Sequence, residues 1–205
     1  MHCKTNFSFL EGASHPDELV ARAIELGYRA LAITDRNSLA GVVRAYGAAR
    51  KTSLKLIIGA EITPVDAPSV VLWATDRKAY GRLARLITVG RRGAEKGECR
   101  ITIEDIAAHA EGLICLSGCM SGEVAKRLME GQVEQAREVV SFHRDLFGKE
   151  RYFLEVQNQS LDGQDALNRQ IVELGRACDV RIVATNDAHY VKPGDHRAHD
   201  VLLCI

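Results

Sequence analysis

Residues that could bind a metal ion or transfer a proton follow several apolar runs of this sequence. The run 181–185 ends just before Asp187 and His189, and at the other end of the chain His2 is followed by Lys4 and Glu11. Carboxylates and imidazoles at strand ends are typical of metal and catalytic sites in α/β barrels. Lys4 stands where a second histidine would make the N-terminal part of such a site strong.

Other polar residues follow or interrupt the remaining apolar runs. They are Asp35 and Arg36 after 30–34, Glu61 at the end of 56–61, Ser117-Gly118-Cys119 after 112–116, and Glu155 and Gln157 in and after 152–156. In a barrel these positions meet at one mouth, where carboxylates, imidazoles and a thiol are competent ligands for zinc, manganese or iron. Each residue alone has a structural explanation, such as a helix cap for Asp187 or a small buried hydrophobe for Cys119.

The elements that must position these side chains alternate along the chain. Strands are predicted at 30–34, 56–61, 70–74, 112–116, 152–156 and 181–185, with a clipped first strand at 1–3. Such short, continuous apolar runs indicate strands buried on both faces, as in a mostly parallel sheet covered by helices. The alternation is typical of a seven-stranded barrel or a doubly wound sheet.

Helix start and stop signals lie between these strands. Ser14 is the expected cap of a helix with Leu19, Val20, Ala23 and Ile24 inward and Gly27 at its end. Asn37 or Ser38 is the expected cap of the next helix, with Leu39, Val42, Val43 and Tyr46 inward. Thr102 and Asp105 predict a third helix start, 121–147 two helices, and 165–178 a helix with Leu167, Ile171 and Leu174 on one face. The Arg/Lys/Gly-rich segment 90–98 is predicted to be an exposed loop.

Charge and composition exclude some broad classes of function. Of the 205 residues 46% are apolar, and 27 Lys and Arg balance 27 Asp and Glu, so no global field steers the chain to nucleic acid or to a membrane. Positive charge is concentrated in one segment, which contains Arg77, Lys78, Arg82, Arg85, Arg91 and Arg92. It is either a solvated helix face or a binding patch.

Length and cysteine usage indicate a single cytoplasmic domain. The range 1–205 can bury one core, and no apolar run reaches the length that spans a membrane. Six cysteines without paired spacing (3, 99, 115, 119, 178 and 204) are expected to be free thiols in a reducing compartment. The uncapped apolar helix at 200–205 suggests the N-terminal part of a longer chain.

Five segments carry a resemblance to a known family. They are His2–Gly12, Ile33–Arg36, Ile58–Glu61, Leu116–Cys119 and Ala184–Tyr190. In order and spacing they resemble the polymerase-and-histidinol-phosphatase (PHP) domain, and most closely the N-terminal domain of bacterial DNA polymerase III alpha subunits. The stretches 6–17 and 37–43 are most similar to the error-prone paralogue. The resemblance covers nearly the whole chain and implies a distorted seven-stranded (β/α) barrel, with the polymerase domains proper lying outside this chain.

The resemblance also implies a set of metal ligands. Six positions keep a ligand type, namely His2, Glu11, Glu61, Cys119, Asp187 and His189. Lys4 and Arg36 stand where the family has histidines, and Ser69 stands at a third lost ligand. Cations in such a pocket repel metal ions and can neutralise the carboxylates directly. We therefore expect Lys4 and Arg36 to replace the metals as internal ion pairs, no cofactor in this domain, and a cost of roughly 3–5 kcal/mol for Arg36→Ala.

Two functional interpretations remain open. In the first, the chain is a non-catalytic structural module of an error-prone polymerase that acts in replication and damage-tolerant repair synthesis; its partners are the other domains of that chain, DNA through the full-length protein, and other translesion proteins. In the second, it is an active phosphoesterase or 3′–5′ exonuclease that uses zinc or manganese at the mouth. An unrelated hydrolase barrel is a third and weaker interpretation, because the sequence has no nucleophile elbow, P-loop or dinucleotide fingerprint.

Overall fold

A computed structural model of the chain describes residues 2–205, apart from the side chain of Cys119. Its strands are β1 (His2–Cys3), β2 (Ala30–Ile33), β3 (Lys55–Ile62), β4 (Val70–Ala74), β5 (Leu113–Leu116), β6 (Tyr152–Val156), β7 (Arg181–Ala184) and β8 (Asp187–Ala188). Its α-helices are α1 (Pro16–Glu25), α2 (Val42–Ala49), α3 (Arg77–Arg92), α4 (Ile103–His109), α5 (Glu123–Met129), α6 (Val133–Phe147), α7 (Gln164–Cys178) and α8 (His196–Leu203). Two 3₁₀ turns, η1 (Cys119–Ser121) and η2 (Pro193–Asp195), complete the elements within residues 2–205.

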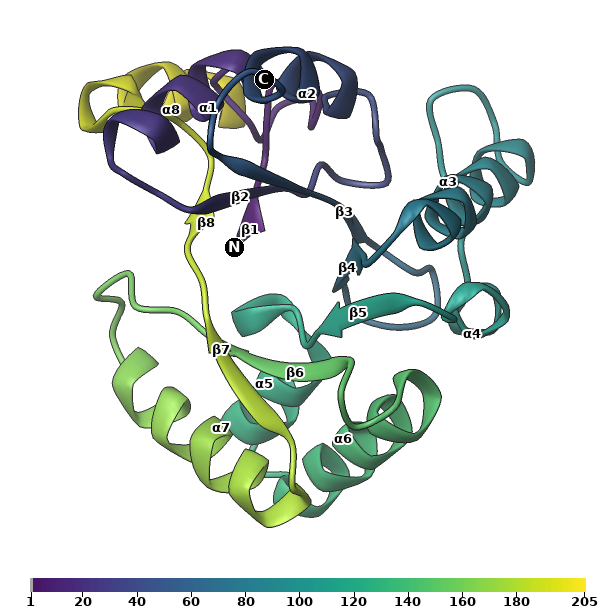
Figure 1. Cartoon of the computed structure of the whole chain (residues 1–205). Helices are drawn as coiled ribbons and strands as arrows, with labels where there is room; N and C mark the ends of the chain where they lie inside the picture. Colours follow the sequence, from purple (N-terminus) through teal and green to yellow (C-terminus); the bar gives the residue numbers. More distant parts are fainter. Residues whose placement is uncertain (1) are drawn as a thin grey trace.

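The strands form a curled sheet with helices on its outer side. Six strands run in the order β2-β3-β4-β5-β6-β7, and β1 pairs separately with β8. Figure 1 shows the sheet bending round a centre where β1 lies between β2 and β8. The expected α/β fold is confirmed as a curled half-barrel. The structure has eight strands within residues 2–205 where the sequence predicted seven, because Asp187–Ala188 forms a separate short strand on β1.

Strand β4 runs against its neighbours, which the sequence pattern did not predict. It is antiparallel to both β3 and β5, whereas β2/β3, β5/β6 and β6/β7 are parallel. The link from Ile62 to Val70 is too short to hold a crossover helix, and a short link joins only antiparallel strands. The absence of a helix-length segment between these two apolar runs was therefore the signal for the reversal.

The first two helices begin later than expected. Helix α1 is capped by His15 and Glu18 in a capping box, while the Ser14 hydroxyl instead accepts a hydrogen bond from Val191 N at 3.1 Å. Helix α2 begins at Val42 after Gly41, so neither Asn37 nor Ser38 is its cap. Ile24, Val43 and Tyr46, which were expected to face inward, are exposed. These faces are not covered by other elements within residues 2–205.

The later elements follow the sequence more closely. Thr102 and Asp105 form the expected capping box, and Gly27 follows α1 with a φ of +71°. Leu167, Ile171 and Leu174 are buried on α7. The predicted exposed loop begins at Gly93 instead of residue 90, because α3 continues to Arg92. None of the helices described here is long and apolar enough to cross a bilayer.

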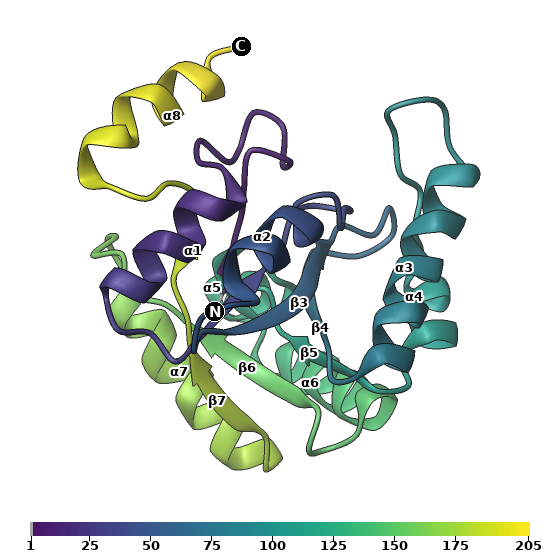
Figure 2. The same cartoon turned by 45° about the horizontal axis from the view of Figure 1, so that its top comes forward.

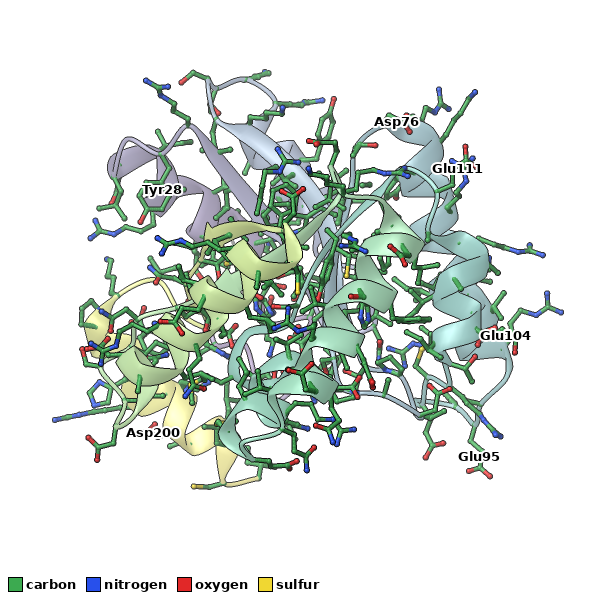
Figure 3. The ribbon with its side chains drawn as sticks, turned by 90° about the horizontal axis from the view of Figure 1, so that it is seen from below. Tyr28, Asp76, Glu95, Glu104, Glu111 and Asp200 are labelled. Carbon is green, nitrogen blue, oxygen red and sulfur yellow. The ribbon has the colours of Figure 1, made fainter. Side chains whose placement is uncertain are left out.

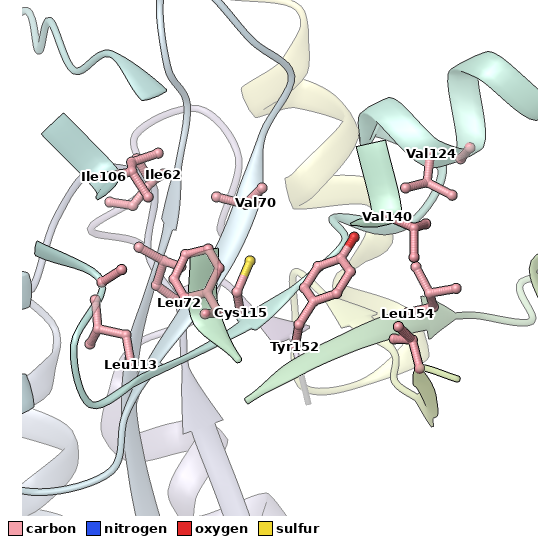
Figure 4. Packing of buried hydrophobic residues seen from close by; sticks show 14 of the residues in the cluster. Ile62, Val70, Leu72, Ile106, Leu113, Cys115, Val124, Val140, Tyr152 and Leu154 are labelled. Carbon is pink, nitrogen blue, oxygen red and sulfur yellow. The ribbon is translucent and has the colours of Figure 1, made fainter. Parts of the chain in front are cut away.

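The apolar interior has two parts. The larger one packs β4, β5 and β6 against α3 to α7, and Figure 4 shows Leu72, Cys115 and Tyr152 side by side within it. The smaller one packs α1 and α2 against β1 and β2. The five cysteines whose side chains are described are free, and three of them are buried, which agrees with the sequence prediction for those five. Both parts leave the strand ends around β1 to polar residues.

Candidate functional site

Eight polar side chains gather where the strand ends meet, and we call them the mouth cluster. They are His2 from β1, Lys4 and Glu11 from the loop after it, Arg36 after β2, Glu61 from β3, Glu155 from β6, and Asp187 and His189 at β8. The register His2↔Asp187 and the bridge Arg36↔Glu61 bring together residues far apart in the sequence. The predicted convergence of strand ends at one mouth is therefore present.

His2 lies among three carboxylates. Its Nε2 is 2.9 Å from Glu61 Oε2 and 3.7 Å from Asp187 Oδ1, and its Nδ1 is 3.6 Å from Glu155 Oε1. Burial disfavours the imidazolium, but Glu155, Glu61 and Asp187 outweigh it and raise the pKa of His2 to about 9. The imidazole at the centre of the mouth is therefore a cation at neutral pH.

Lys4 is the second cation inside the mouth. Its Nζ is 2.9 Å from Glu61 Oε2 and 3.1 Å from Glu11 Oε2, and only 6% of its side chain is exposed. Burial alone would lower the pKa of Lys4, but Glu61, Asp187 and Glu11 raise it. In the same way burial would raise the pKa of Glu61, but His2 and Lys4 lower it to about 2. Lys4 thus bridges the carboxyl groups of Glu11 and Glu61.

Arg36 lies at the rim and not inside. Its Nη1 is 2.6 Å from Glu11 Oε1 and its Nη2 is 3.9 Å from Glu61 Oε1, while 46% of its side chain is exposed. Water therefore screens much of its attraction for these carboxylates. The expectation that removing Arg36 would strand buried charges needs correction, because the buried carboxylates keep Lys4 and His2.

Asp187 and His189 form a third group at β8. His189 Nε2 is 3.2 Å from Asp187 Oδ2, and its Nδ1–H donates to Glu11 O at 2.8 Å. Burial opposes ionisation of both groups, yet the bond between them, with His2 and Lys4 nearby, holds the pKa of Asp187 well below its usual range. The same bond raises the pKa of His189. The two residues expected to work together at the C-terminal strand end do contact each other.

The loop that carries Glu11 is anchored by Asp35. Its Oδ1 accepts hydrogen bonds from Thr5 N at 2.7 Å and from Ser8 Oγ at 2.8 Å, and Ser8 Oγ in turn accepts from Arg36 N. Burial raises the pKa of Asp35 despite these bonds. A Cβ at Gly12 would lie 2.0 Å from Thr5 O, so the loop closes this tightly only with glycine there. Asp35 therefore shapes the mouth and lies outside the cluster itself.

Glu155 is the member of the cluster that the resemblance did not include. It is fully buried and is held by the hydroxyl of Thr185 and by Gln157 Nε2, 3.3 Å from its Oε1. Its Oε2 has no hydrogen-bond partner among the described residues. A carboxylate interrupting an apolar strand was the available signal, because a buried charge needs a nearby partner.

Two further positions were predicted as a lost and a surviving ligand, Ser69 and Cys119. The Ser69 hydroxyl donates to Thr63 Oγ1 at 3.3 Å and forms no hydrogen bond with a described residue of the mouth. Cys119 lies in η1, and its side chain is outside the described part of the structure. The assignment of Cys119 as a surviving ligand type therefore stays a prediction.

Among the described side chains of residues 2–205, no group of three or more His, Cys, Asp or Glu side chains has the arrangement of a metal-binding site, although His2 lies among three carboxylates. The Nζ of Lys4 lies between Glu11 and Glu61, and a protonated amine has no lone pair for a metal. Both carboxylates therefore face a cation that the protein itself supplies.

A curled α/β half-barrel with carboxylates and imidazoles at one mouth places the chain in a known class of folds. A candidate metal-dependent phosphoesterase from Bifidobacterium adolescentis superposes with a TM-score of 0.58 at 18% identity, covering 94% of this chain and 88% of that one. An amidohydrolase from Chromobacterium violaceum, with bound sulfate and no metal, gives a TM-score of 0.67 at 13% identity, covering 98% and 95%. At these identities the likeness concerns the fold alone.

Sequence comparison identifies the family. The PHP domain model matches residues 1–159, and the chain belongs to the PHP domain family. An error-prone DNA polymerase of Rhodopirellula baltica is 42% identical over all of this chain and 18% of its own length. A similar enzyme of Aromatoleum aromaticum is 60% identical over 57% of this chain and 11% of its own length. A DNA polymerase III subunit alpha of Aquifex aeolicus is 33% identical over all of this chain and 19% of its own length. The chain thus spans about a fifth or less of these relatives.

Proposed function

We propose that this chain is the N-terminal PHP domain of an error-prone bacterial DNA polymerase, and that it serves there as a non-catalytic structural module. The similarity to error-prone polymerases supports the first part of the proposal. The position of Lys4 carries the second part, because its Nζ lies within 3.1 Å of two carboxylates of the mouth. Parts of a polymerase that bind nucleotide and template belong to the remainder of such a chain, which is also the expected partner of this domain.

The ammonium group of Lys4 lies between two carboxylates that a metal ion would need as ligands. Glu11 and Glu61 already neutralise Lys4, so a divalent ion must displace a buried ammonium or share carboxylates with it. Like charges a few ångströms apart repel strongly in a poorly solvated site. Arg36 adds a further positive group at the rim, paired with Glu11. The mouth is therefore closed by ion pairs that hold β1, β2 and β3 together without a metal.

Metal titration tests this proposal. Purified chain is dialysed against Mn²⁺ or Zn²⁺, and the bound metal is measured by elemental analysis and calorimetry. We expect no tight binding by the wild-type chain and a gain of binding in the double variant Lys4→His plus Arg36→His. The matched control is Lys149→His plus Arg181→His, which replaces two surface cations that also pair with carboxylates. Tightly bound metal at near one equivalent in the wild-type chain would overturn the proposal.

A second candidate function is an active metal-dependent phosphoesterase or 3′–5′ exonuclease. Asp187 Oδ1 and Glu155 Oε2 favour it, because both are buried without a hydrogen-bond partner among the described residues and could serve a ligand. The assay is hydrolysis of a phosphate ester and of a DNA 3′ end with added Mn²⁺. Activity that Asp187→Ala abolishes would support this candidate, and inactivity of the wild-type chain would exclude it under these conditions.

The proposal also covers the closure of the barrel, the cellular location and the partners of this domain. We infer that β1 joins the six-stranded curled sheet beside β2 as the seventh strand of a distorted barrel, with the short strand β8 paired to it. The hydrogen bond from Thr34 N to Cys3 O, at 2.8 Å, supports this closure on the β2 side. A cytoplasmic location, contact with other translesion proteins, and contact with DNA through the full-length protein are part of the proposal for such a polymerase.

A further inference from the structure

Helix α3 carries the highest local density of positive charge in this chain. Its sixteen residues include six Lys and Arg and no Asp or Glu, although the whole chain is neutral. Its buried side is made by Ala79, Leu83, Leu86, Ile87 and Gly90. This side packs against the larger apolar interior and leaves the opposite side of the helix to solvent. Figures 1 and 2 show α3 at the edge of the domain with its outer side uncovered.

The six cations divide into two groups by what they contact. Arg82 pairs with Glu111, and Arg91 donates to the carbonyls of Gly97, Glu98 and Asn37. These two residues hold neighbouring segments of the domain in place. The other four, Arg77, Lys78, Arg85 and Arg92, are exposed and have no hydrogen bond or ion pair within residues 2–205. Their charge is therefore available to a ligand.

The four free cations form one strip. By the 3.6-residue period, they lie on the side of α3 opposite its buried residues. Lys78, Arg85 and Arg92 are seven residues apart, so their Cα atoms follow each other at about 10 Å along the helix axis. That spacing is roughly three base-pair steps of a DNA duplex at about 3.4 Å each. Between them lie Gly81 and Thr88, which let a backbone approach closely.

Carboxylates border this strip but do not interrupt it. Figure 3 labels Asp76, Glu95, Glu104 and Glu111 along the edge formed by α3 and α4. Asp76 caps α3 by accepting from Ala79 N at 2.8 Å, and Glu111 is paired with Arg82. Glu104 belongs to α4 and Glu95 to the loop after α3. Within residues 2–205, none of these four carboxylates forms an ion pair with a residue of the strip.

We propose that this strip, defined by Arg77, Lys78, Arg85 and Arg92, binds the phosphate backbone of duplex DNA without reading its sequence. A regular row of unpaired cations complements a regular row of phosphates, and guanidinium groups suit phosphate oxygens. The relatives of this chain are DNA polymerases, which places a domain of this kind close to a duplex. The C-terminal end of the strip is tied to the mouth side by the bond from Arg91 to Asn37 O, 3.2 Å long. The strip shares no residue with the mouth cluster, so this proposal does not depend on the metal content of the mouth.

The test is binding of the 205-residue chain to a fluorescein-labelled duplex of about 20 base pairs and arbitrary sequence. Anisotropy is followed at several NaCl concentrations from about 50 to 200 mM for the wild type and for the triple variant Lys78→Gln, Arg85→Gln, Arg92→Gln. We expect the triple variant to bind at least about tenfold more weakly at the lowest salt. The slope of log K against log salt should fall by roughly 2 to 3, about one unit for each phosphate that the variant no longer neutralises.

A matched control separates a site from diffuse charge. The variant Arg50→Gln, Lys51→Gln, Lys55→Gln removes three other exposed cations that form no ion pair within residues 2–205, and we expect less than a twofold change in affinity. Thermal unfolding of each variant checks that the fold is kept. Equal losses in both triple variants, or no loss in the first, would overturn the proposal. A single strand of the same sequence forms the last arm, and a loss there as large as for the duplex would contradict duplex binding.

Discussion

His2 and His143 are both almost completely buried, yet their surroundings drive them to opposite charge states. His2 sits in the mouth cluster, where three carboxylates raise its pKa to about 9. His143 sits on α6 beside the rings of Phe147 and Tyr152, where burial lowers its pKa and only a bond to Val139 O and the more distant charge of Glu123 oppose the shift. Burial lowers the pKa of both His2 and His143. The difference lies in the charged neighbours, so the mouth is a site of balanced charge and the α6 region an ordinary apolar interior.

The largest expected effect on this comparison comes from removing the buried ammonium group of Lys4. Lys4→Met keeps most of the side-chain volume but leaves Glu61 and Glu11 with one cation fewer. Breaking a buried ion pair costs about 3–5 kcal/mol, and we expect about 3 because His2 still donates to Glu61. The measurement is the free energy of unfolding from urea titration at neutral pH.

Two further variants show whether the destabilisation comes from charge. Lys149→Met removes an exposed lysine paired with Asp179, and we expect a change of less than about 0.5 kcal/mol. Combining Lys4→Met with Glu61→Gln should cost less than the sum of the two single variants, since the second change removes the stranded charge. Strict additivity would mean that Lys4 contributes through packing and not through its ion pairs.

The α6 region should respond to pH in a way that reveals its neutral histidine. Because the pKa of His143 is lower in the folded than in the unfolded chain, the unfolded chain binds more protons as the pH falls through 6.5. The stabilisation from neutral His143 is complete above that pH and is lost below it. We expect His143→Gln to remove on the order of 1 kcal/mol of the stability loss between about pH 7.5 and pH 5.

His109 supplies the matched control for this experiment. It makes the same bond within its own helix, from Nδ1 to Asp105 O at 2.8 Å, but it is less buried than His143. His109→Gln therefore removes a histidine with the same local bond from a less buried place, and its profile is the reference for that of His143→Gln. If both variants flatten the profile to the same extent, general titration of histidines and not the apolar setting of His143 explains the effect.

Much of the site could be predicted from the sequence, because strand ends in an α/β fold meet at one place whatever their separation along the chain. That rule brought His2, Glu61 and Asp187 together. It could not give the direction of β4, which depends on the length of the link before it. It could not give the exposure of Arg36 either, because depth within a mouth depends on how the loops pack. The same rule placed Asp35 at the mouth. Its carboxylate instead accepts hydrogen bonds from Thr5 and Ser8 and so anchors the loop that carries Glu11.

Glu155 was predicted at the mouth from its place in an apolar run, and the structure confirms that placement. Its position within β6 places it on one of two faces of the sheet, and the period of a strand does not decide which face turns to the mouth. The structure resolves this through the contacts of Glu155 with Thr185 and His2. The buried carboxylate of Glu155 beside His2 distinguishes this half of the mouth from the half where Lys4 lies inside and Arg36 at the rim.

Arg36 provides the smallest and sharpest test within the mouth. It shares Glu11 with Lys4, but about half of its side chain is in water, and exposed ion pairs contribute roughly 0–1 kcal/mol. We expect Arg36→Ala to cost roughly 0.5 kcal/mol at low salt and less at about 0.5 M NaCl, where Lys4→Met keeps its full effect because buried pairs are poorly screened. Urea titrations at several salt concentrations give the ratio of the destabilisation by Lys4→Met to that by Arg36→Ala. This ratio measures how much more the buried ion pairs of the mouth contribute to stability than the exposed one. A salt-independent cost of about 3 kcal/mol or more for Arg36→Ala would mean that the guanidinium is shielded from water in the folded chain and that rim and interior form one buried network.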